Sequence, residues 1–268
     1  MIDAHLHCWR LDRAERLWPT PGEGPLFADW PLTAAEAEAR AAGITGAVLV
    51  QTQEDGRDTD WLLEQAEASA FVQAVVGWAD PAAPDAVRRI AALATRPKLA
   101  GLRPMVQGRP DNYYDDPALD RAWAAMATQN LVLDALVRPG HLPALARLAV
   151  RHPTLRIMID HGGKPDFDEE GAAALRRLMP LAALPNIACK LSGLLTEAKG
   201  CDIAPFVAGM LKLFGPERTA WGSDWPVVSP LAGYADWLRL ARTLVPPSAH
   251  EAVFSGTARS WYRLEERA

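Results

Sequence analysis

The sequence predicts a single-domain (β/α)8 barrel, the TIM-barrel fold, and three observations support this fold class. Eight short runs of β-branched or apolar residues recur along the 268-residue chain, and each is followed by a stretch with helical periodicity. The runs are apolar on both faces apart from isolated polar residues, as in a buried parallel sheet. Such barrels typically take about 250 residues, so we expect one domain over residues 1–268. An open doubly wound sheet is the alternative, but the glycine-rich turn that usually follows its first strand is missing here.

The expected elements alternate along the whole chain without a linker or domain boundary. The strand candidates are Ile2–His7, Ala47–Thr52, Ala74–Asp80, Leu99–Met105, Val132–Arg138, Arg156–His161, Ile187–Ser192 and Thr219–Asp224. A capping box at Thr33–Glu36 predicts the start of the first helix, which ends near Gly43. Further helices are expected at Asp60–Ala70, Asp85–Thr95, Pro117–Asn130, Leu142–His152, Glu169–Leu181, Ala204–Phe214 and Tyr234–Leu244, with a helical tail through Arg259.

The composition is ordinary for a globular protein and excludes several classes. Apolar residues make up 49% and charged residues 23% of the chain. With 33 acidic and 28 basic residues the formal net charge is −5, which argues against a nucleic-acid partner. No apolar run approaches the roughly 20 residues that span a bilayer, so no membrane association is expected. Three cysteines, and a first segment unlike a secretory leader, predict a reducing, cytoplasmic location.

Polar residues at the ends of the predicted strands are the candidates for chemistry, because barrel sites lie at the carboxyl ends of the strands. His5 and His7 end the first run. Strict alternation places both imidazoles on one side of the strand, together with Asp3. Two converging neutral imidazoles suit a divalent metal, zinc above all, although two hydrogen-bonded barrel histidines are the alternative. The residues then expected to face the helices are Ile2, Ala4 and Leu6.

Two further strand-end residues are candidates for catalysis. Asp224 ends the eighth run, where a carboxylate could join the histidines as a metal ligand or accept a proton from an attacking water. A turn-forming aspartate before Trp-Pro is the structural alternative. His161 ends the sixth run and could polarise a carbonyl, bind a metal or cap the following turn.

Five residues are candidates for contact with substrate. Arg103 offers a planar fork for a carboxylate or vicinal hydroxyls, though a structural salt bridge fits equally well. Lys190, in an otherwise apolar run, either forms a buried ion pair or points at substrate. Lys164 lies in a Gly-Gly-Lys-Pro loop expected at the mouth, and Trp225 ends a strand where it could stack on a sugar ring. Gln51 ends the second run.

With these residues assembled, the sequence resembles the amidohydrolase superfamily, and within it the amidohydrolase 2 barrel hydrolases that include sugar lactonases. The motifs span nearly the whole chain in the expected order, and they are specific as a set. They are Ile2-Asp3-Ala4-His5-Leu6-His7, Val50-Gln51, Gly101-Leu102-Arg103-Pro104, Asp160-His161-Gly162-Gly163-Lys164-Pro165, Lys190-Leu191-Ser192-Gly193 and Trp221-Gly222-Ser223-Asp224-Trp225-Pro226.

The resemblance also bears on metal content. Binuclear members bridge two metals with a lysine that ends the fourth strand, where this sequence has Leu102-Arg103-Pro104. Mononuclear members generally end the fifth strand with a histidine, and the run Val132–Arg138 has none. At most one divalent metal, zinc by preference, is therefore expected on His5, His7 and Asp224, with His161 as a further candidate ligand. The lactonase branch includes enzymes without an essential metal, so the resemblance leaves metal dependence open.

The resemblance implies hydrolysis of a small sugar-acid lactone, of the fuconolactone, galactonolactone or rhamnonolactone type, in carbohydrate catabolism. Asp224 would then be the general base, with His161 assisting at the carbonyl. One alternative is a metal-dependent decarboxylase of the same superfamily. Another is a non-catalytic barrel that binds sugar acids. The sequence is compatible with a homo-oligomer and does not specify one.

Overall fold

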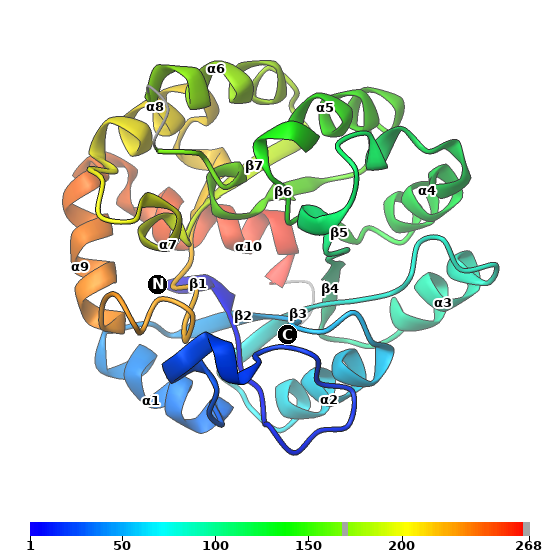
Figure 1. Cartoon of the computed structure of the whole chain (residues 1–268), viewed down its shortest axis with the longest axis horizontal. Helices are drawn as coiled ribbons and strands as arrows, with labels where there is room; N and C mark the ends of the chain where they lie inside the picture. The colour runs from blue at the N-terminus through cyan, green and yellow to red at the C-terminus, as the bar shows by residue number, and fades with distance from the viewer. Residues whose placement is uncertain (168–170, 265–268) are drawn as a thin grey trace.

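The computed structural model describes residues 1–167 and 171–264, and its strands form a closed parallel barrel ringed by helices (Figure 1). Strand order follows chain order from β1 to β8, and all seven neighbouring pairs are parallel. The last strand returns to the first, because the His7 amide donates to the Trp225 carbonyl at 2.8 Å. This confirms the predicted (β/α)8 barrel. The strands are β1 Ile2–Leu6, β2 Gly46–Val50, β3 Val72–Gly77, β4 Leu99–Leu102, β5 Val132–Ala135, β6 Ile157–Ile159, β7 Ile187–Leu191 and β8 Thr219–Trp221.

The helices lie close to their expected positions, with two differences. The first helix begins at Leu32 after Pro31, with no side-chain cap, so Thr33 is already helical and the predicted capping box is wrong. A short helix after β7 was not predicted. The expected start at Glu169 lies outside the described residues. No helix within the described ranges is long and apolar enough to cross a membrane. The helices are α1 Leu32–Ala41, α2 Gly56–Glu67, α3 Ala86–Leu93, α4 Asp120–Thr128, α5 Leu142–Arg151, α6 Gly171–Ala182, α7 Leu194–Ala198, α8 Ala204–Phe214, α9 Tyr234–Leu244 and α10 Thr257–Tyr262.

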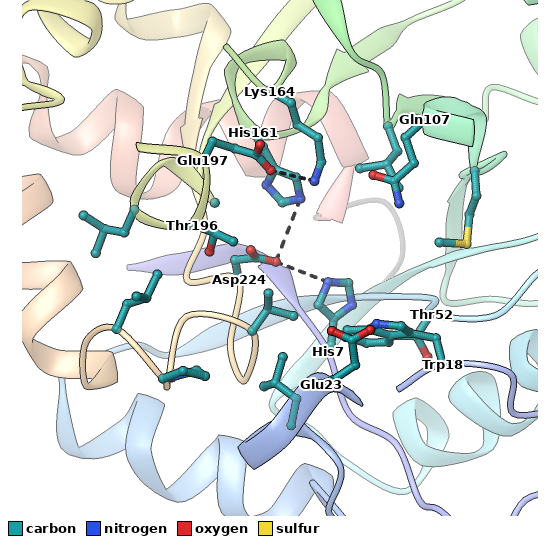
Figure 2. Close-up of a pocket in the computed structure, with 18 of the residues that line it drawn as sticks. His7, Trp18, Glu23, Thr52, Gln107, His161, Lys164, Thr196, Glu197 and Asp224 are labelled. Carbon is teal, nitrogen blue, oxygen red and sulfur yellow. Dashed lines mark hydrogen bonds and ion pairs between the residues drawn. The ribbon is translucent and has the colours of Figure 1, made fainter. Parts of the chain in front are cut away.

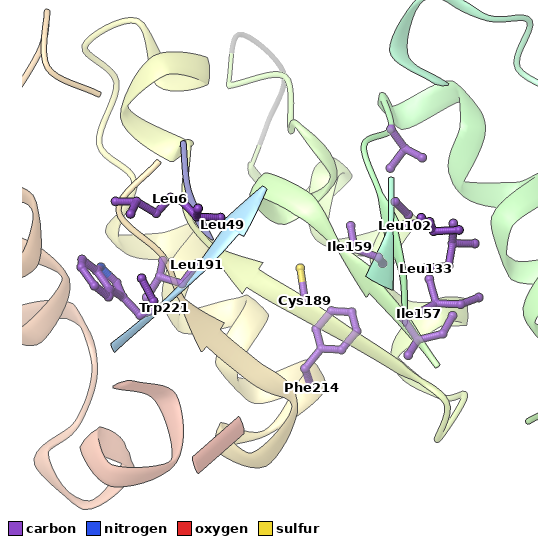
Figure 3. Close-up of a cluster of buried hydrophobic side chains, with 14 of the residues drawn as sticks. Leu6, Leu49, Leu102, Leu133, Ile157, Ile159, Cys189, Leu191, Phe214 and Trp221 are labelled. Carbon is purple, nitrogen blue, oxygen red and sulfur yellow. The ribbon is translucent and has the colours of Figure 1, made fainter. Parts of the chain in front are cut away.

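Two apolar cores hold the barrel rigid. The larger lies between the strands and the helices, and Figure 3 shows part of it, including Leu49, Leu133 and Ile157. The smaller fills the lower barrel with Val48, Val50 and Met158, and the α10 residues Trp261 and Tyr262 close it from below. Both faces of each strand are therefore buried, which is why the strand runs are almost continuously apolar. Polar side chains are therefore concentrated at or near the carboxyl ends of the strands.

A β-bulge in β1 changes which of its residues face inward. Asp3 pairs with Ala47 and Leu6 with Leu49, so three steps along β1 match two along β2. One extra residue breaks the strict alternation. Ile2 and Ala4 therefore pack inside the barrel rather than against the helices, which corrects the prediction for both. Leu6 faces the helices as expected.

Asp3 also leaves the side that was predicted for it. Its Oδ2 accepts a 2.8 Å hydrogen bond from the Tyr234 hydroxyl on α9. Its Oδ1 accepts the backbone amides of His5 at 3.0 Å and Ser223 at 2.9 Å. One buried carboxylate thus secures the bulge and joins the end of β1 to the residues that follow β8. Asp3 therefore supports the site from outside the barrel.

Candidate functional site

A cavity of about 760 Å³ opens at the carboxyl ends of the strands (Figure 2). This volume suits a small-molecule ligand, and its place in the barrel is the one expected for an active site. Its wall combines strand-end residues with loops that follow β1, β7 and β8. The lining residues that the argument uses are His7, Trp18, Arg103, His161, Lys164, Glu197 and Asp224.

Four side chains meet at the bottom of the cavity around one carboxylate oxygen, and we call His5, His7, His161 and Asp224 the cavity-floor cluster. Asp224 Oδ1 lies 3.4 Å from His7 Nε2 and 3.7 Å from His5 Nε2. The same oxygen lies 3.9 Å from His161 Nε2. The Nε2 atoms of His5 and His7 are 3.2 Å apart. All four residues are buried, so the residues predicted to act together do come together.

Backbone conformation places two of these residues. Asp224 (φ 56°) and His161 (φ 55°) both lie in the left-handed region, which non-glycine residues seldom adopt and which is common at functional sites. The Asp224 amide donates to the His5 carbonyl at 2.8 Å, which ties its backbone to β1. Gly193 gives His161 its space, because a Cβ there would lie 2.5 Å from Nδ1 of the imidazole. The local backbone is thus shaped around the site.

Hydrogen bonds define how His5 and His7 present their nitrogens. Lys190 Nζ lies 2.9 Å from His5 Nδ1, and an ammonium can only donate. At the other end His7 Nδ1 lies 2.7 Å from the Val50 carbonyl, which can only accept. The series of hydrogen bonds from Lys190 through the two imidazoles to Val50 therefore runs in one direction, and each ring accepts on the Lys190 side and donates on the Val50 side. In neutral rings the His5 proton is on Nε2, from which it is donated to Nε2 of His7, and the His7 proton is on Nδ1.

The electrostatics keep the carboxylate charged and two of the imidazoles neutral. Burial lowers the pKa of His161 to about 4, against the attraction of Asp224. Burial and the Lys190 charge hold the pKa of His5 well below its ordinary value. Burial alone would raise the pKa of Asp224, but the surrounding histidines outweigh it and lower that pKa. At neutral pH such a cluster can accept a proton or bind a cation.

The cavity-floor cluster also fits a single divalent metal by the chemistry of its donors. Four ligands about 2.0 Å from a tetrahedral zinc lie about 3.3 Å from one another. The distances from Asp224 Oδ1 to the three imidazoles and the distance between His5 and His7 are 3.2–3.9 Å, close to this value. Of the four residues, His5, His161 and Asp224 offer ligand atoms that all lie within 4.8 Å of one another. The Val50 carbonyl orients His7 as a protein acceptor typically orients a metal-binding imidazole. His5 would join the set only with its proton on Nδ1, donated to Asp160 Oδ1 3.3 Å away in place of the hydrogen bond that Nδ1 accepts from Lys190.

A second polar group lies directly beneath, and we call Arg103, Asp134, Asp160 and Lys190 the buried ion layer. Lys190 Nζ lies 2.5 Å from Asp134 Oδ2 and 2.9 Å from Asp160 Oδ1. Arg103 Nη1 lies 3.2 Å from Asp160 Oδ2, and its Nη2 donates to the Gln51 carbonyl. Burial alone would raise the pKa of Asp160, but Lys190, His5 and Arg103 hold it well below its usual range. Asp134 and Asp160 were not predicted to serve the site.

The five expected substrate contacts divide into two groups. Arg103 and Lys164 line the cavity, although each already has an ion-pair partner, and Lys164 Nζ lies 2.8 Å from Glu197 Oε1. Three are absent from the cavity wall that the described residues form. Lys190 and Trp225 are fully buried, and Gln51 is buried with its amide donating to the Arg103 carbonyl at 2.7 Å. The buried ion pair, rather than the substrate contact, is the role that the structure gives Lys190.

Trp18 is a cavity residue that the sequence did not indicate. It lies in an irregular loop, where no periodicity marks it, and it lines the same cavity as His7 (Figure 2). Gln53, just after β2, holds this loop. Its Oε1 accepts the amides of Leu17 at 2.7 Å and Trp18 at 3.3 Å, and its Nε2 donates to the Trp18 carbonyl at 2.6 Å. In the sequence, the polar residues that follow the second strand were the signal that could have pointed to these hydrogen bonds between Gln53 and the loop.

Comparisons with known proteins show the family to which the chain belongs. A family model described as amidohydrolase matches residues 2–264. The chain is 41% identical to an L-fucono-1,5-lactonase of Burkholderia ambifaria, over 98% of this chain and 96% of that protein. It is 34% identical to an L-fucono-1,5-lactonase of Burkholderia multivorans, over 100% and 97%. A crystal structure of a Burkholderia multivorans amidohydrolase with bound zinc superposes with a TM-score of 0.91 at 33% identity, covering 98% of both chains. The chain therefore belongs to the amidohydrolase family.

Proposed function

We propose that this protein is a lactonase that opens the ring of a sugar-acid lactone, of the L-fucono-1,5-lactone, galactonolactone or rhamnonolactone type. The observation that carries the proposal is the ionised Asp224 carboxylate facing three imidazoles at the bottom of a cavity of about 760 Å³. The names of the two Burkholderia relatives support this substrate class. A fixed base beside hydrogen-bonding imidazoles is what ester hydrolysis by water needs.

In this mechanism Asp224 Oδ1 accepts a proton from a water molecule whose oxygen attacks the lactone carbonyl carbon. The negative charge that develops on the carbonyl oxygen is stabilised by the imidazole N–H of His161, which lines the cavity. When the ring C–O bond breaks, the protonated Asp224 returns its proton to the ring oxygen. Water is consumed, and the product is an open-chain hydroxy acid.

Other residues would hold the substrate or a metal. The guanidinium of Arg103 and the Lys164–Glu197 pair lie where they can bond to sugar hydroxyls, and Trp18 offers an apolar surface beside His7. His5, His7, His161 and Asp224 are the residues that would hold a divalent ion, with zinc the preferred candidate. Such an ion would supply Lewis-acid polarisation and lower the pKa of a bound water.

The direct test is a hydrolysis screen of sugar lactones with a pH indicator, on metal-stripped and zinc-loaded protein in parallel. We expect acid release from one lactone series. Asp224→Asn should lower that rate at least about 100-fold, because it removes the base. The exposed Asp236→Asn on α9 is the matched control and should retain full activity. Wild-type rates in a folded Asp224→Asn protein would rule out this role.

The same screen separates the alternatives. Activity in both preparations would support a reaction carried by the protein groups, and activity only with zinc would make the cavity-floor cluster a metal site. Carbon dioxide release from an aromatic or muconate-type acid would support the decarboxylase instead. Tight lactone binding without hydrolysis would support a binding protein.

A further inference from the structure

The ammonium group of Lys190 has surroundings that resemble those of a bound metal ion. It lies 2.5 Å from Asp134 Oδ2, 2.9 Å from Asp160 Oδ1 and 2.9 Å from His5 Nδ1. All four side chains are fully buried. Two carboxylate oxygens and an imidazole nitrogen form a ligand set typical of divalent transition-metal ions.

Taken without the lysine, the same three acceptors form a potential metal site. One ligand atom from each of His5, Asp134 and Asp160 lies within 4.8 Å of the others. This set lies below the cavity-floor cluster and shares only His5 with it. Two adjacent cation positions are thus present in the barrel, one open to the cavity and one that contains Lys190.

The charges explain why a cation must be present in the lower position. Asp134 and Asp160 are both fully buried, and Arg103 forms its ion pair with Asp160 rather than with Asp134. The Tyr262 hydroxyl donates to both Asp134 oxygens at 2.9 Å and supplies no charge. Loss of Lys190 would leave a buried carboxylate without a counter-ion, which is strongly unfavourable.

We propose that Lys190 is a built-in cation that takes the place of a second divalent metal and so limits this site to a single metal ion. The lysine also holds Nδ1 of His5, so that Nε2 of the same ring faces the cavity-floor cluster. Lys190 is thereby a positioning residue: it does not line the cavity, and it acts through His5 and through exclusion of a metal. The proposal concerns metal content and does not depend on which lactone is hydrolysed.

The test is a count of zinc ions bound per chain, by elemental analysis after dialysis of the metal-stripped protein against zinc. Lys190→Ala opens the space and leaves all three acceptors, so we expect it to bind one zinc ion more than the wild type. Lys190→Met fills the space with an apolar chain and should bind no additional zinc. The double variant Lys190→Ala/Asp134→Asn should return to the wild-type number.

A matched control is Lys98→Ala. Lys98 Nζ is partly buried and donates to the carbonyls of Ala66, Ser69 and Val72 at 2.7–2.9 Å, without a carboxylate among these contacts. Removing that ammonium should therefore add no zinc. An equal gain in Lys98→Ala and Lys190→Ala would show that the extra ion is non-specific and would overturn the proposal.

A folded Lys190→Ala protein with the same zinc count as the wild type would also overturn it. If that variant does not fold, the proposal is tested on the wild-type protein by crystallography. A zinc-soaked crystal of the wild type should show no anomalous peak among His5, Asp134 and Asp160. A zinc ion bound there with Lys190 displaced would refute the proposal.

Discussion

The cavity-floor cluster and the buried ion layer are two polar regions of one barrel, one directly above the other, with opposite charge arrangements. In the buried ion layer one lysine and one arginine balance two carboxylates, every member has an ion-pair contact, and of the four members only Arg103 lines the cavity. In the cavity-floor cluster one carboxylate faces imidazoles, and three of its four members line the cavity. A balanced, enclosed network contributes to the fold, whereas an acceptor set that opens to a cavity can take part in chemistry. We therefore expect changes in the lower region to reduce stability first, and changes in the upper region to reduce the rate.

Lys190→Met should show the largest effect. It leaves Asp134 buried without its cation, so the free energy of unfolding should fall by about 3–5 kcal/mol. Adding Asp134→Asn removes the uncompensated charge and should recover much of that loss, which urea denaturation of the single and double variants would measure. If the double variant is as unstable as the sum of the two single variants, the two residues do not interact as a pair.

Tyr262→Phe tests the layer from below. The hydroxyl donates to both oxygens of Asp134, and a hydrogen bond to a charged group contributes about 1.5–3 kcal/mol. We expect a loss of about 2 kcal/mol in the free energy of unfolding, with lactone turnover close to that of the wild type. A large fall in turnover without a change in stability would contradict the division between the two regions.

The upper region should make stability depend on pH. Burial lowers the pKa of His161 to about 4 in the folded protein, whereas an unfolded histidine titrates near 6.5. Between these values the unfolded chain binds the extra proton, so stability falls as the pH drops from about 6.5 toward 4. For the metal-stripped protein this contribution is at most about 1.4 kcal/mol per pH unit.

The measurement for this prediction compares urea denaturation of the wild type and His161→Asn at pH 7.5 and pH 5. The variant should lose less stability than the wild type over this interval, because it lacks the titrating ring. Equal losses in the two proteins would mean that His161 is not held neutral by the fold.

Trp18→Leu should have the smallest effect, and it should concern substrate binding. Trp18 lines the cavity, whereas Asp224 supplies the proposed base, so we expect KM to rise about three- to tenfold with kcat little changed. The partly exposed Trp78→Leu, outside the cavity lining formed by the described residues, is the control and should leave KM unchanged. A fall in kcat with KM unchanged would place Trp18 in the chemical step instead.

The sequence alone was enough to predict the barrel and much of its active end. The alternation of apolar runs and amphipathic stretches is local, and it specifies strands, helices and their order. Because strand ends converge in a barrel, polar residues far apart in sequence could be assigned to one site. His7, His161 and Asp224, assigned in this way, line one cavity together with Arg103 and Lys164, and their roles stay predictions.

Strand register, the partners of buried charges and the position of irregular loops depend on tertiary structure, and local sequence patterns do not contain them. The bulge in β1 depends on pairing with β2, and it reversed the faces predicted for Ile2 and Ala4. The partners of Lys190 lie 30 and 56 residues away on neighbouring parts of the barrel, so the sequence could offer a buried ion pair as one alternative but could not identify the partners. Trp18 reaches the cavity from an irregular loop held by Gln53. Periodicity records which side of an element is buried, whereas the partner of a buried charge is determined by long-range packing.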